Sequence, residues 1–166
     1  MIKRAFTSLI LLVLISCKSA KTDFKFDKIT YHTSACFGFC PVVHLEVNAD
    51  KSIRLHAEKI YSKTGGGTDE SRIGYFTGIV ADSTYNILIN ELRTIGLDTL
   101  KFDGPDCCDG ATKTIIAHYN GKRKYFRAMF PPDRAFPLIA ILNDIYSASK
   151  LTRTSEEFEL ERDSIH

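Results

Sequence analysis

The chain has 166 residues, of which 22 are basic (Lys or Arg) and 20 are acidic, and hydrophobic residues make up 44% of it. This length suits one globular domain, and no internal repeat, coiled-coil heptad or low-complexity segment is visible. The near balance of charge argues against a nucleic-acid-binding protein and against membrane attachment through a basic patch.

The first 16 residues have the pattern of a lipoprotein signal peptide. Lys3 and Arg4 precede an apolar run, Ala5 to Ile15. This run is about half as long as the roughly 20 residues that a membrane-spanning helix needs. It ends in Leu14-Ile15-Ser16-Cys17, which matches the lipobox pattern Leu-(Ile/Ala/Val)-(Ser/Gly/Ala)-Cys at every position. We therefore expect cleavage before Cys17 and acylation of this cysteine. The alternative is an ordinary secretory leader with a chance cysteine.

Cleavage at this site has consequences for charge and location. Loss of Lys3 and Arg4 leaves 20 basic and 20 acidic residues, a neutral mature domain. Two or more acyl chains give stable anchoring, and bacterial lipoproteins are usually triacylated. We therefore expect a stable anchor at the acylated Cys17, with residues 17–27 as a polar tether, and the resemblance to bacterial lipoproteins implies the outer membrane. No acidic run follows the cysteine, which favours the periplasmic face over surface exposure.

Residues 28–149 carry the patterns of a single α+β domain, beginning with a hairpin. Apolar residues at positions 43, 45 and 47, and again at 53, 55 and 57, alternate with polar ones, which is typical of half-buried strands. A three-residue loop, 49–51, pairs Val47 with Ile53 and places His44 opposite His56 on the outer face. A two-residue loop would mix the faces. The longer loop requires a left-handed residue, which predicts mild strain at Lys51.

The remaining elements follow in order. We expect a strand at about 72–78, a helix over 82–95 capped by Asp82 and ended by Gly96, and strands 114–119 and 122–130 joined by Asn120-Gly121. A second helix begins near Asp133. The charged tail, 150–166, lacks a sustained apolar face, so we expect it to be loosely held. This order predicts an α+β fold, an antiparallel sheet built from hairpins with two helices packed on one face.

Once Cys17 is lipidated, four cysteines remain as disulfide candidates: Cys36, Cys40, Cys107 and Cys108. An even number in an exported domain indicates disulfides. A Cys107–Cys108 bridge would be strained, because adjacent Cα atoms are about 3.8 Å apart and disulfides usually span about 4.4–6.8 Å. Chain entropy favours the pairings that join the two distant loops, at about 4 kcal/mol against about 2 for a short loop. A glycine at position 38 permits a tight turn, so a local Cys36–Cys40 bridge stays open as an alternative.

A metal site and a redox site are the alternatives to structural disulfides. The four cysteines could bind zinc or copper(I), but their Cys-x3-Cys and Cys-Cys spacings differ from paired Cys-x2-Cys. A thioredoxin-like site would need Cys-x-x-Cys before a helix. His44 and His56, if paired across the hairpin, could hold a metal with one more ligand, although such solvent-facing histidines are more often inert. No catalytic constellation or cofactor fingerprint is visible, so we expect no cofactor and no resident metal, and favour a non-enzyme.

The motif Cys36-Phe37-Gly38-Phe39-Cys40-Pro41 carries a resemblance. With the hairpin, helix and later hairpin after it, the chain resembles, over about residues 28–148, a family of bacterial lipoproteins common in the Bacteroidota. Its shared domain has no known function, and its motif is Cys-(Phe/Tyr)-Gly-x-Cys-Pro. Many members lack the Cys107-Cys108 pair, and the resemblance implies a local bridge within the motif in those members.

The family has no established activity, so the resemblance implies a location and a fold. Our leading hypothesis is a non-enzymatic, lipid-anchored envelope domain that binds an envelope protein or polymer. The alternative is a redox or metal-handling lipoprotein that uses the four cysteines.

Overall fold

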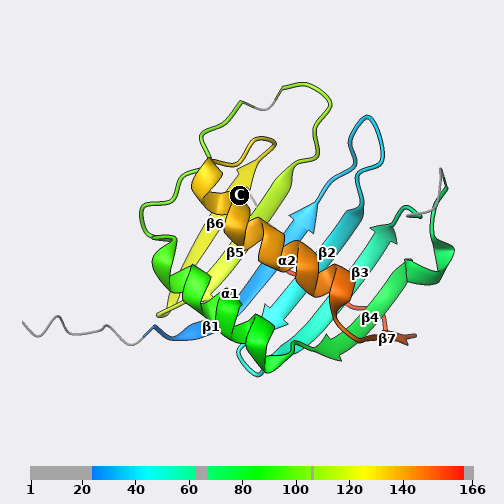
Figure 1. Cartoon of the computed structure of the whole chain (residues 1–166), viewed down its shortest axis with the longest axis horizontal. Coiled ribbons are helices and arrows are strands. Elements are labelled where there is room, and N and C mark those ends of the chain that lie inside the picture. Colours follow the sequence, from blue (N-terminus) through cyan, green and yellow to red (C-terminus); the bar gives the residue numbers. More distant parts are fainter. Residues whose placement is uncertain (1–23, 63–66, 106, 163–166) are drawn as a thin grey trace, which may run out of the picture.

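The computed structural model describes residues 24–62, 67–105 and 107–162, and it forms a seven-stranded sheet with two helices across one face (Figure 1). All neighbouring strands are antiparallel, in the order β6-β5-β1-β2-β3-β4-β7. This confirms the predicted α+β fold. The predicted signal peptide and Cys17 lie outside the described residues. The elements are β1 (Phe26–Thr33), β2 (Val42–Asn48), β3 (Ser52–Lys59), β4 (Gly74–Ile79), α1 (Asp82–Thr94), β5 (Lys113–Tyr119), β6 (Lys122–Ala128), α2 (Phe136–Ala148) and β7 (Leu151–Thr154).

The β2–β3 hairpin has the register that its sequence predicts. Val47 lies opposite Ile53, and His44 lies opposite His56. Lys51 has a φ of 69°, so the loop does place a non-glycine residue in the left-handed region, where most side chains are disfavoured. Burial of the apolar face therefore selects the register even at the cost of this strain.

Both helices form where the periodicity predicts them. Helix α1 begins at Asp82 itself; the capping position is Ala81, with no side-chain cap hydrogen bond, so the predicted capping role of Asp82 is wrong. Gly96 follows the helix with a φ of 72°, as predicted. A 3₁₀ turn, Asp133–Ala135, leads into α2. No helix among the described residues combines the length and apolarity needed to cross a bilayer.

The hydrophobic core lies between the helices and the sheet. Every second residue of the central strands faces it, and the helices contribute apolar residues at three- and four-residue spacing. Fully buried members include Ile29, Leu45, Leu88, Leu138 and Leu142. The opposite face of the sheet consequently carries the alternate, largely polar residues of β1, β2 and β3.

Strand β1 lies in the interior of the sheet, between β5 and β2. From the sequence we expected the first residues of this strand to belong to the tether, and we predicted no strand over the rest of it. A β-bulge between Phe26 and Lys28 shifts its pairing with β5 by one residue. This bulge interrupts the alternation of apolar residues that would otherwise reveal a strand. Phe24 stacks on Tyr119 with ring centroids 5.6 Å apart, so order begins within the segment expected to be tether.

The C-terminal tail differs from the expectation of a loosely held segment. It forms β7 on β4 and then crosses the polar face of the sheet as an extended segment, Phe158–Arg162, which we call the strap. Phe158 packs edge-on against Tyr75 on β4, whereas Glu161 contacts side chains on β1, β5 and β6. Leu160 between them is buried. A few long-range contacts hold the strap, which explains why its sequence shows no periodic pattern.

Candidate functional site

Four aromatic rings form a row across the polar face of the sheet. His32 on β1 lies opposite His44 on β2, His44 opposite His56 on β3, and His56 opposite Tyr75 on β4. The successive ring centroids are 5.0, 5.6 and 4.1 Å apart. The row therefore concentrates imidazole nitrogens on one surface, although its members come from four different strands.

Two histidines of this row and a neighbouring glutamate could hold a metal ion. The ligand atoms of His44, His56 and Glu58 all lie within 4.8 Å of one another. The structure thus brings together the two histidines that the sequence singled out. Glu58 was missed, and its signal is the two-residue spacing from His56, which places both side chains on the same face of β3.

A chain of hydrogen bonds fixes the protons on these histidines. Nε2 of His32 is 2.7 Å from the backbone carbonyl oxygen of Glu161. A carbonyl only accepts, so this nitrogen carries a proton. Nδ1 of His32 lies 2.8 Å from Nδ1 of His44. Because a neutral His32 can only accept there, Nδ1 of His44 is the donor, a tautomer inferred from the network.

The same network of hydrogen bonds leaves two hydrogen-bond acceptors facing each other. With its proton on Nδ1, a neutral His44 has a lone pair on Nε2, and this atom is 2.8 Å from Oε1 of Glu58. A carboxylate is also acceptor-only. A lone pair and a carboxylate oxygen at this distance need a cation between them, either a proton or a metal ion.

The local environment disfavours the proton. Burial lowers the pKa of His32 to about 4 and outweighs the hydrogen bond to Glu161. Burial also lowers the pKa of His44, although the adjacent carboxylate of Glu58 opposes this. The proximity of His44 in turn lowers the pKa of Glu58. Near neutral pH these shifts favour a neutral His44 beside an ionised Glu58, the arrangement that accommodates another cation.

A cavity of about 480 Å³ opens beside the three ligands. His44, His56 and Tyr75 line it from the sheet, and the strap closes its other side. Nη2 of Arg162 in the strap is 3.6 Å from Oε1 of Glu58, so this guanidinium supplies part of the positive charge at the site. The cavity leaves room for a further ligand on a bound ion.

Glu161 fastens the strap over this cavity. Its carboxylate accepts hydrogen bonds from Nε of Arg123 and from Nε2 of His118, both at 2.7 Å. It also lies 3.0 Å from Nζ of Lys28. Burial alone would raise the pKa of Glu161, but these three donors outweigh it and hold the pKa at about 2. The strap is therefore held by an ionised carboxylate at neutral pH.

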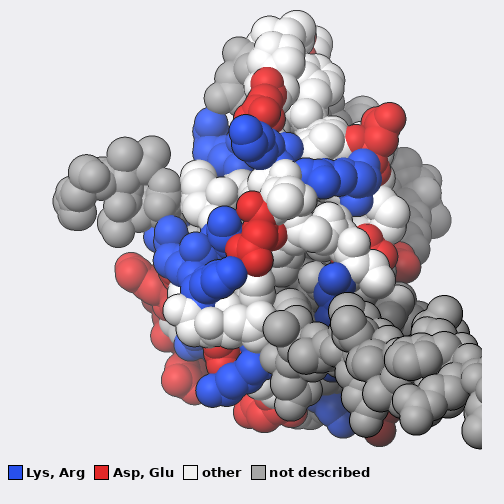
Figure 2. Space-filling view, turned by 90° about the vertical axis from the view of Figure 1, so that its left-hand side faces the viewer, with Lys and Arg blue, Asp and Glu red and all other residues white. Residues whose placement is uncertain are grey.

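The basic cluster 122–124 lies on strand β6, at one edge of the sheet. Viewed from that side, Lys and Arg side chains are interspersed with Asp and Glu (Figure 2). Lys122 and Lys124 lie 3.0 and 3.7 Å from the carboxylate of Asp98, and Arg123 pairs with Glu161. The cluster thus pairs with acidic partners within the domain.

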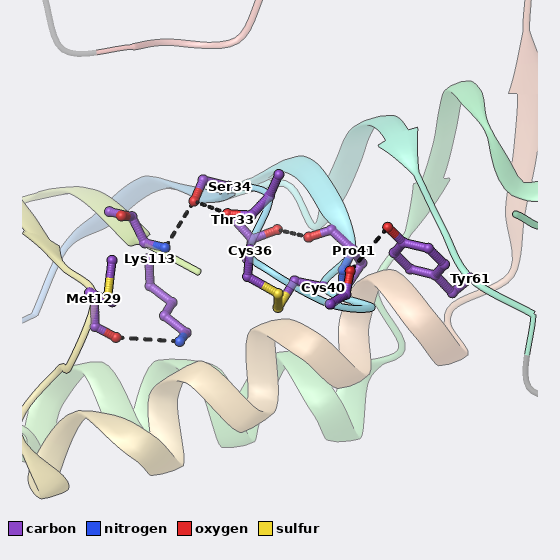
Figure 3. The surroundings of a disulfide bond; sticks show 11 residues. Thr33, Ser34, Cys36, Cys40, Pro41, Tyr61, Lys113 and Met129 are labelled. Atoms are coloured by element: carbon purple, nitrogen blue, oxygen red, sulfur yellow. Dashed lines mark hydrogen bonds between the residues drawn. A yellow bond between two sulfur atoms is a disulfide. The ribbon is translucent and has the colours of Figure 1, made fainter. Parts of the chain in front are cut away.

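The disulfide of the domain joins Cys36 to Cys40, with Cα atoms 5.6 Å apart (Figure 3). Cys107 and Cys108 are exposed free thiols. The pairings between the two loops, which chain entropy favoured, are therefore not formed. Gly38, at a φ of 151°, allows the tight local turn. Because two of the four cysteines are oxidised, the thiolate metal site considered from sequence is also not assembled.

The disulfide closes a loop that displays two phenylalanines. Phe37 is 88% exposed and Phe39 is 71% exposed, the two highest values among the exposed large hydrophobic residues. Phe39 packs edge-on against Tyr61, and the backbone N–H of Phe37 donates to the carbonyl of Asp109 at 3.0 Å. The loop is thus held on both sides while its aromatic rings face solvent.

The comparison with known families adds one finding. The profile of DUF6438, a domain of unknown function, matches residues 27–137. This span includes the disulfide, the histidine row and Glu58, and it ends inside α2 before the strap begins. No curated protein matches the chain.

Proposed function

Because the chain belongs to the DUF6438 family, whose function is unknown, we propose from its own geometry that it is a lipid-anchored envelope domain that binds a divalent transition-metal ion at His44, His56 and Glu58. One observation carries the metal site. Nε2 of His44 faces Oε1 of Glu58 at 2.8 Å while Nδ1 of the same ring is engaged by His32. This geometry suits a cation shared between the imidazole nitrogen and the carboxylate oxygen.

The donor set selects the class of metal. Two imidazole nitrogens and one carboxylate oxygen suit zinc or copper(II), whereas magnesium and calcium prefer sites made of oxygen atoms alone. Metal-binding histidines usually donate their other ring N–H to a partner that fixes the tautomer. His32 occupies that position for His44. Three protein ligands beside a cavity leave a fourth position for water or another small ligand.

Isothermal titration with Zn²⁺ tests the metal site. The mature chain carries Cys17→Ser for solubility and Cys107→Ser/Cys108→Ser to remove competing thiols. We expect one bound ion, and at least a tenfold weaker dissociation constant, about 1.4 kcal/mol, after His44→Ala or His56→Ala.

The control for this titration is Glu157→Gln, an exposed carboxylate outside the ligand set and outside the contacts that hold the strap. It should leave the affinity for Zn²⁺ unchanged. Equal loss in Glu157→Gln and His44→Ala would contradict the assignment, as would no binding by the parent protein.

The anchor rests on the lipobox at residues 14–17 and the polar segment after it. The signal peptide would be removed at Cys17, and the acylated cysteine would hold the domain on the periplasmic face of the outer membrane. Metabolic labelling with a radioactive fatty acid, followed by membrane fractionation, tests this. Cys17→Ser should abolish the label and release the mature protein, and a label that persists would contradict it.

Protein binding through the disulfide-closed loop is a second candidate. Exposed aromatic rings on a rigid loop are typical of interaction sites, because ordering costs little on binding. Phe37 and Phe39 are the specific observation that favours it. Crosslinking in intact envelopes should recover a partner that a Phe37→Ser/Phe39→Ser variant loses; the same partner on both would contradict this role.

A further inference from the structure

We propose that Cys107 and Cys108 form a reversible thiol–disulfide pair, a redox site separate from the histidine cluster. Both thiols are exposed, and their Sγ atoms lie 2.7 Å apart. This inference goes beyond metal binding and does not depend on it, because no ligand of the proposed metal site takes part.

The backbone brings the two sulfur atoms together. In an extended strand, successive side chains point to opposite faces, which would separate adjacent thiols. Here Cys108 has a φ of 72°, a left-handed conformation that is uncommon for residues other than glycine. With this turn the two Sγ atoms lie on the same side of the chain. The conformation thus prepares the pair for direct bond formation.

The segment around the pair is held by contacts with the disulfide-closed loop. The carbonyl of Asp109 accepts from the N–H of Phe37 at 3.0 Å. Thr112 exchanges two hydrogen bonds with Ser34: its carbonyl accepts from the Ser34 N–H at 3.0 Å, and its N–H donates to the Ser34 hydroxyl at 2.9 Å. The thiols are therefore presented on a supported turn beside the disulfide-closed loop.

The chemistry requires an external disulfide as the oxidant. The thiolate of one cysteine attacks that disulfide, forms a mixed disulfide and expels one thiolate. The second cysteine, as its thiolate, attacks the protein sulfur of the mixed disulfide and expels the other. The Cys107–Cys108 bond forms, the two protein thiols lose their protons and two electrons, and the external disulfide becomes two thiols.

The new bond is expected to be more easily reduced than the existing one. Cys36 and Cys40 have Cα atoms 5.6 Å apart, inside the usual disulfide range. Adjacent residues have Cα atoms about 3.8 Å apart, below that range. Strained, exposed disulfides have higher reduction potentials and are the labile ones. The domain would then combine a stable bridge at Cys36–Cys40 with a labile bridge at Cys107–Cys108.

Trypsin separates the two pairs, which makes the test direct. Residues 102–113 contain Cys107 and Cys108 between two lysines, and residues 29–51 contain Cys36 and Cys40. The mature chain with Cys17→Ser is equilibrated in glutathione buffers of increasing oxidised fraction, quenched in acid, alkylated and digested. Mass spectrometry then counts alkyl groups on each peptide.

We expect peptide 102–113 to change in one step from two alkyl groups to none, with the loss of two hydrogens. Peptide 29–51 should remain unalkylated, because its disulfide is intact, at ratios of oxidised to reduced glutathione at which peptide 102–113 is still reduced. A Cys107→Ser variant should instead carry one glutathione on Cys108, because the resolving thiol is gone.

Three results would overturn the proposal. They are two alkyl groups on 102–113 at every ratio, stable glutathione adducts on the parent peptide, or a disulfide between two chains. The Zn²⁺ titration uses the Cys107→Ser/Cys108→Ser protein, which lacks this pair, so failure here and failure of the metal site are distinguishable.

Discussion

Replacing Glu161 with Gln should release the strap from the polar face of the sheet. The substitution keeps the shape of the side chain but removes the charge that Arg123, His118 and Lys28 contact at 2.7–3.0 Å. Hydrogen bonds to charged groups contribute about 1.5–3 kcal/mol when well buried, whereas exposed ion pairs contribute about 0.2–1 kcal/mol. The Glu161 side chain is 22% exposed, so we take about 0.7 kcal/mol for each contact and about 2 kcal/mol in total.

Hydrogen exchange measures this release directly. A loss of 2 kcal/mol raises the open population of the strap by about 30-fold, and the amides of residues 158–162 should exchange faster by that factor. The matched control is Glu157→Gln, an exposed carboxylate directly before the strap, which should leave the exchange of these amides unchanged. Unchanged protection in Glu161→Gln, or equal effects of the two variants, would refute the reasoning.

The same contacts predict a pH dependence. The pKa of Glu161 is about 2 in the folded state, below the value of about 4.3 for an unperturbed glutamate. The stabilisation is therefore fully present above about pH 5 and is lost as the pH falls toward 2. Protection of the strap amides, corrected for intrinsic exchange, should decrease over this range in the parent protein and remain low in Glu161→Gln.

Three stability predictions follow from other parts of the fold. Replacing Cys36 and Cys40 with Ser should lower the free energy of unfolding by about 2 kcal/mol, the chain-entropy value for so short a loop; denaturant unfolding with no change would contradict it. Lys51→Gly should raise the free energy of unfolding by about 0.5 kcal/mol, because relief of left-handed strain exceeds the loss of an exposed ion pair; a decrease in the urea midpoint would show the reverse balance. Glu46→Ala should lower the free energy of unfolding by about 2 kcal/mol, because Glu46 is 2% exposed and accepts two charge-assisted hydrogen bonds from Arg54; a thermal midpoint within about 2 °C of the parent would argue against this.

The sequence correctly predicts those parts of the fold in which only one arrangement buries the apolar side chains and leaves the charged ones exposed. The β2–β3 register is correct because any one-residue slip would bury charged side chains. Strand β1 was missed because a bulge between Phe26 and Lys28 breaks its alternation. The strap was missed because Leu160 and Glu161 hold it through long-range contacts, which leave no periodic trace.

The candidate site was predictable only in part. The hairpin register follows from local sequence, so the pairing of His44 with His56 across the two strands could be predicted. The proton arrangement was not predictable, because it depends on His32 from another strand and on a backbone carbonyl in the strap. Glu58 was missed because an exposed glutamate on a strand carries no hydrophobic pattern.

The most direct test of the metal site is anomalous diffraction at the zinc edge from crystals of the mature protein, carrying Cys17→Ser and Cys107→Ser/Cys108→Ser, soaked in Zn²⁺. We predict one anomalous peak bonded to Nε2 of His44, with His56 and Glu58 as further ligands and the His32–His44 hydrogen bond retained. Absence of a peak there, with Nε2 of His44 still hydrogen-bonded to Glu58, would contradict it.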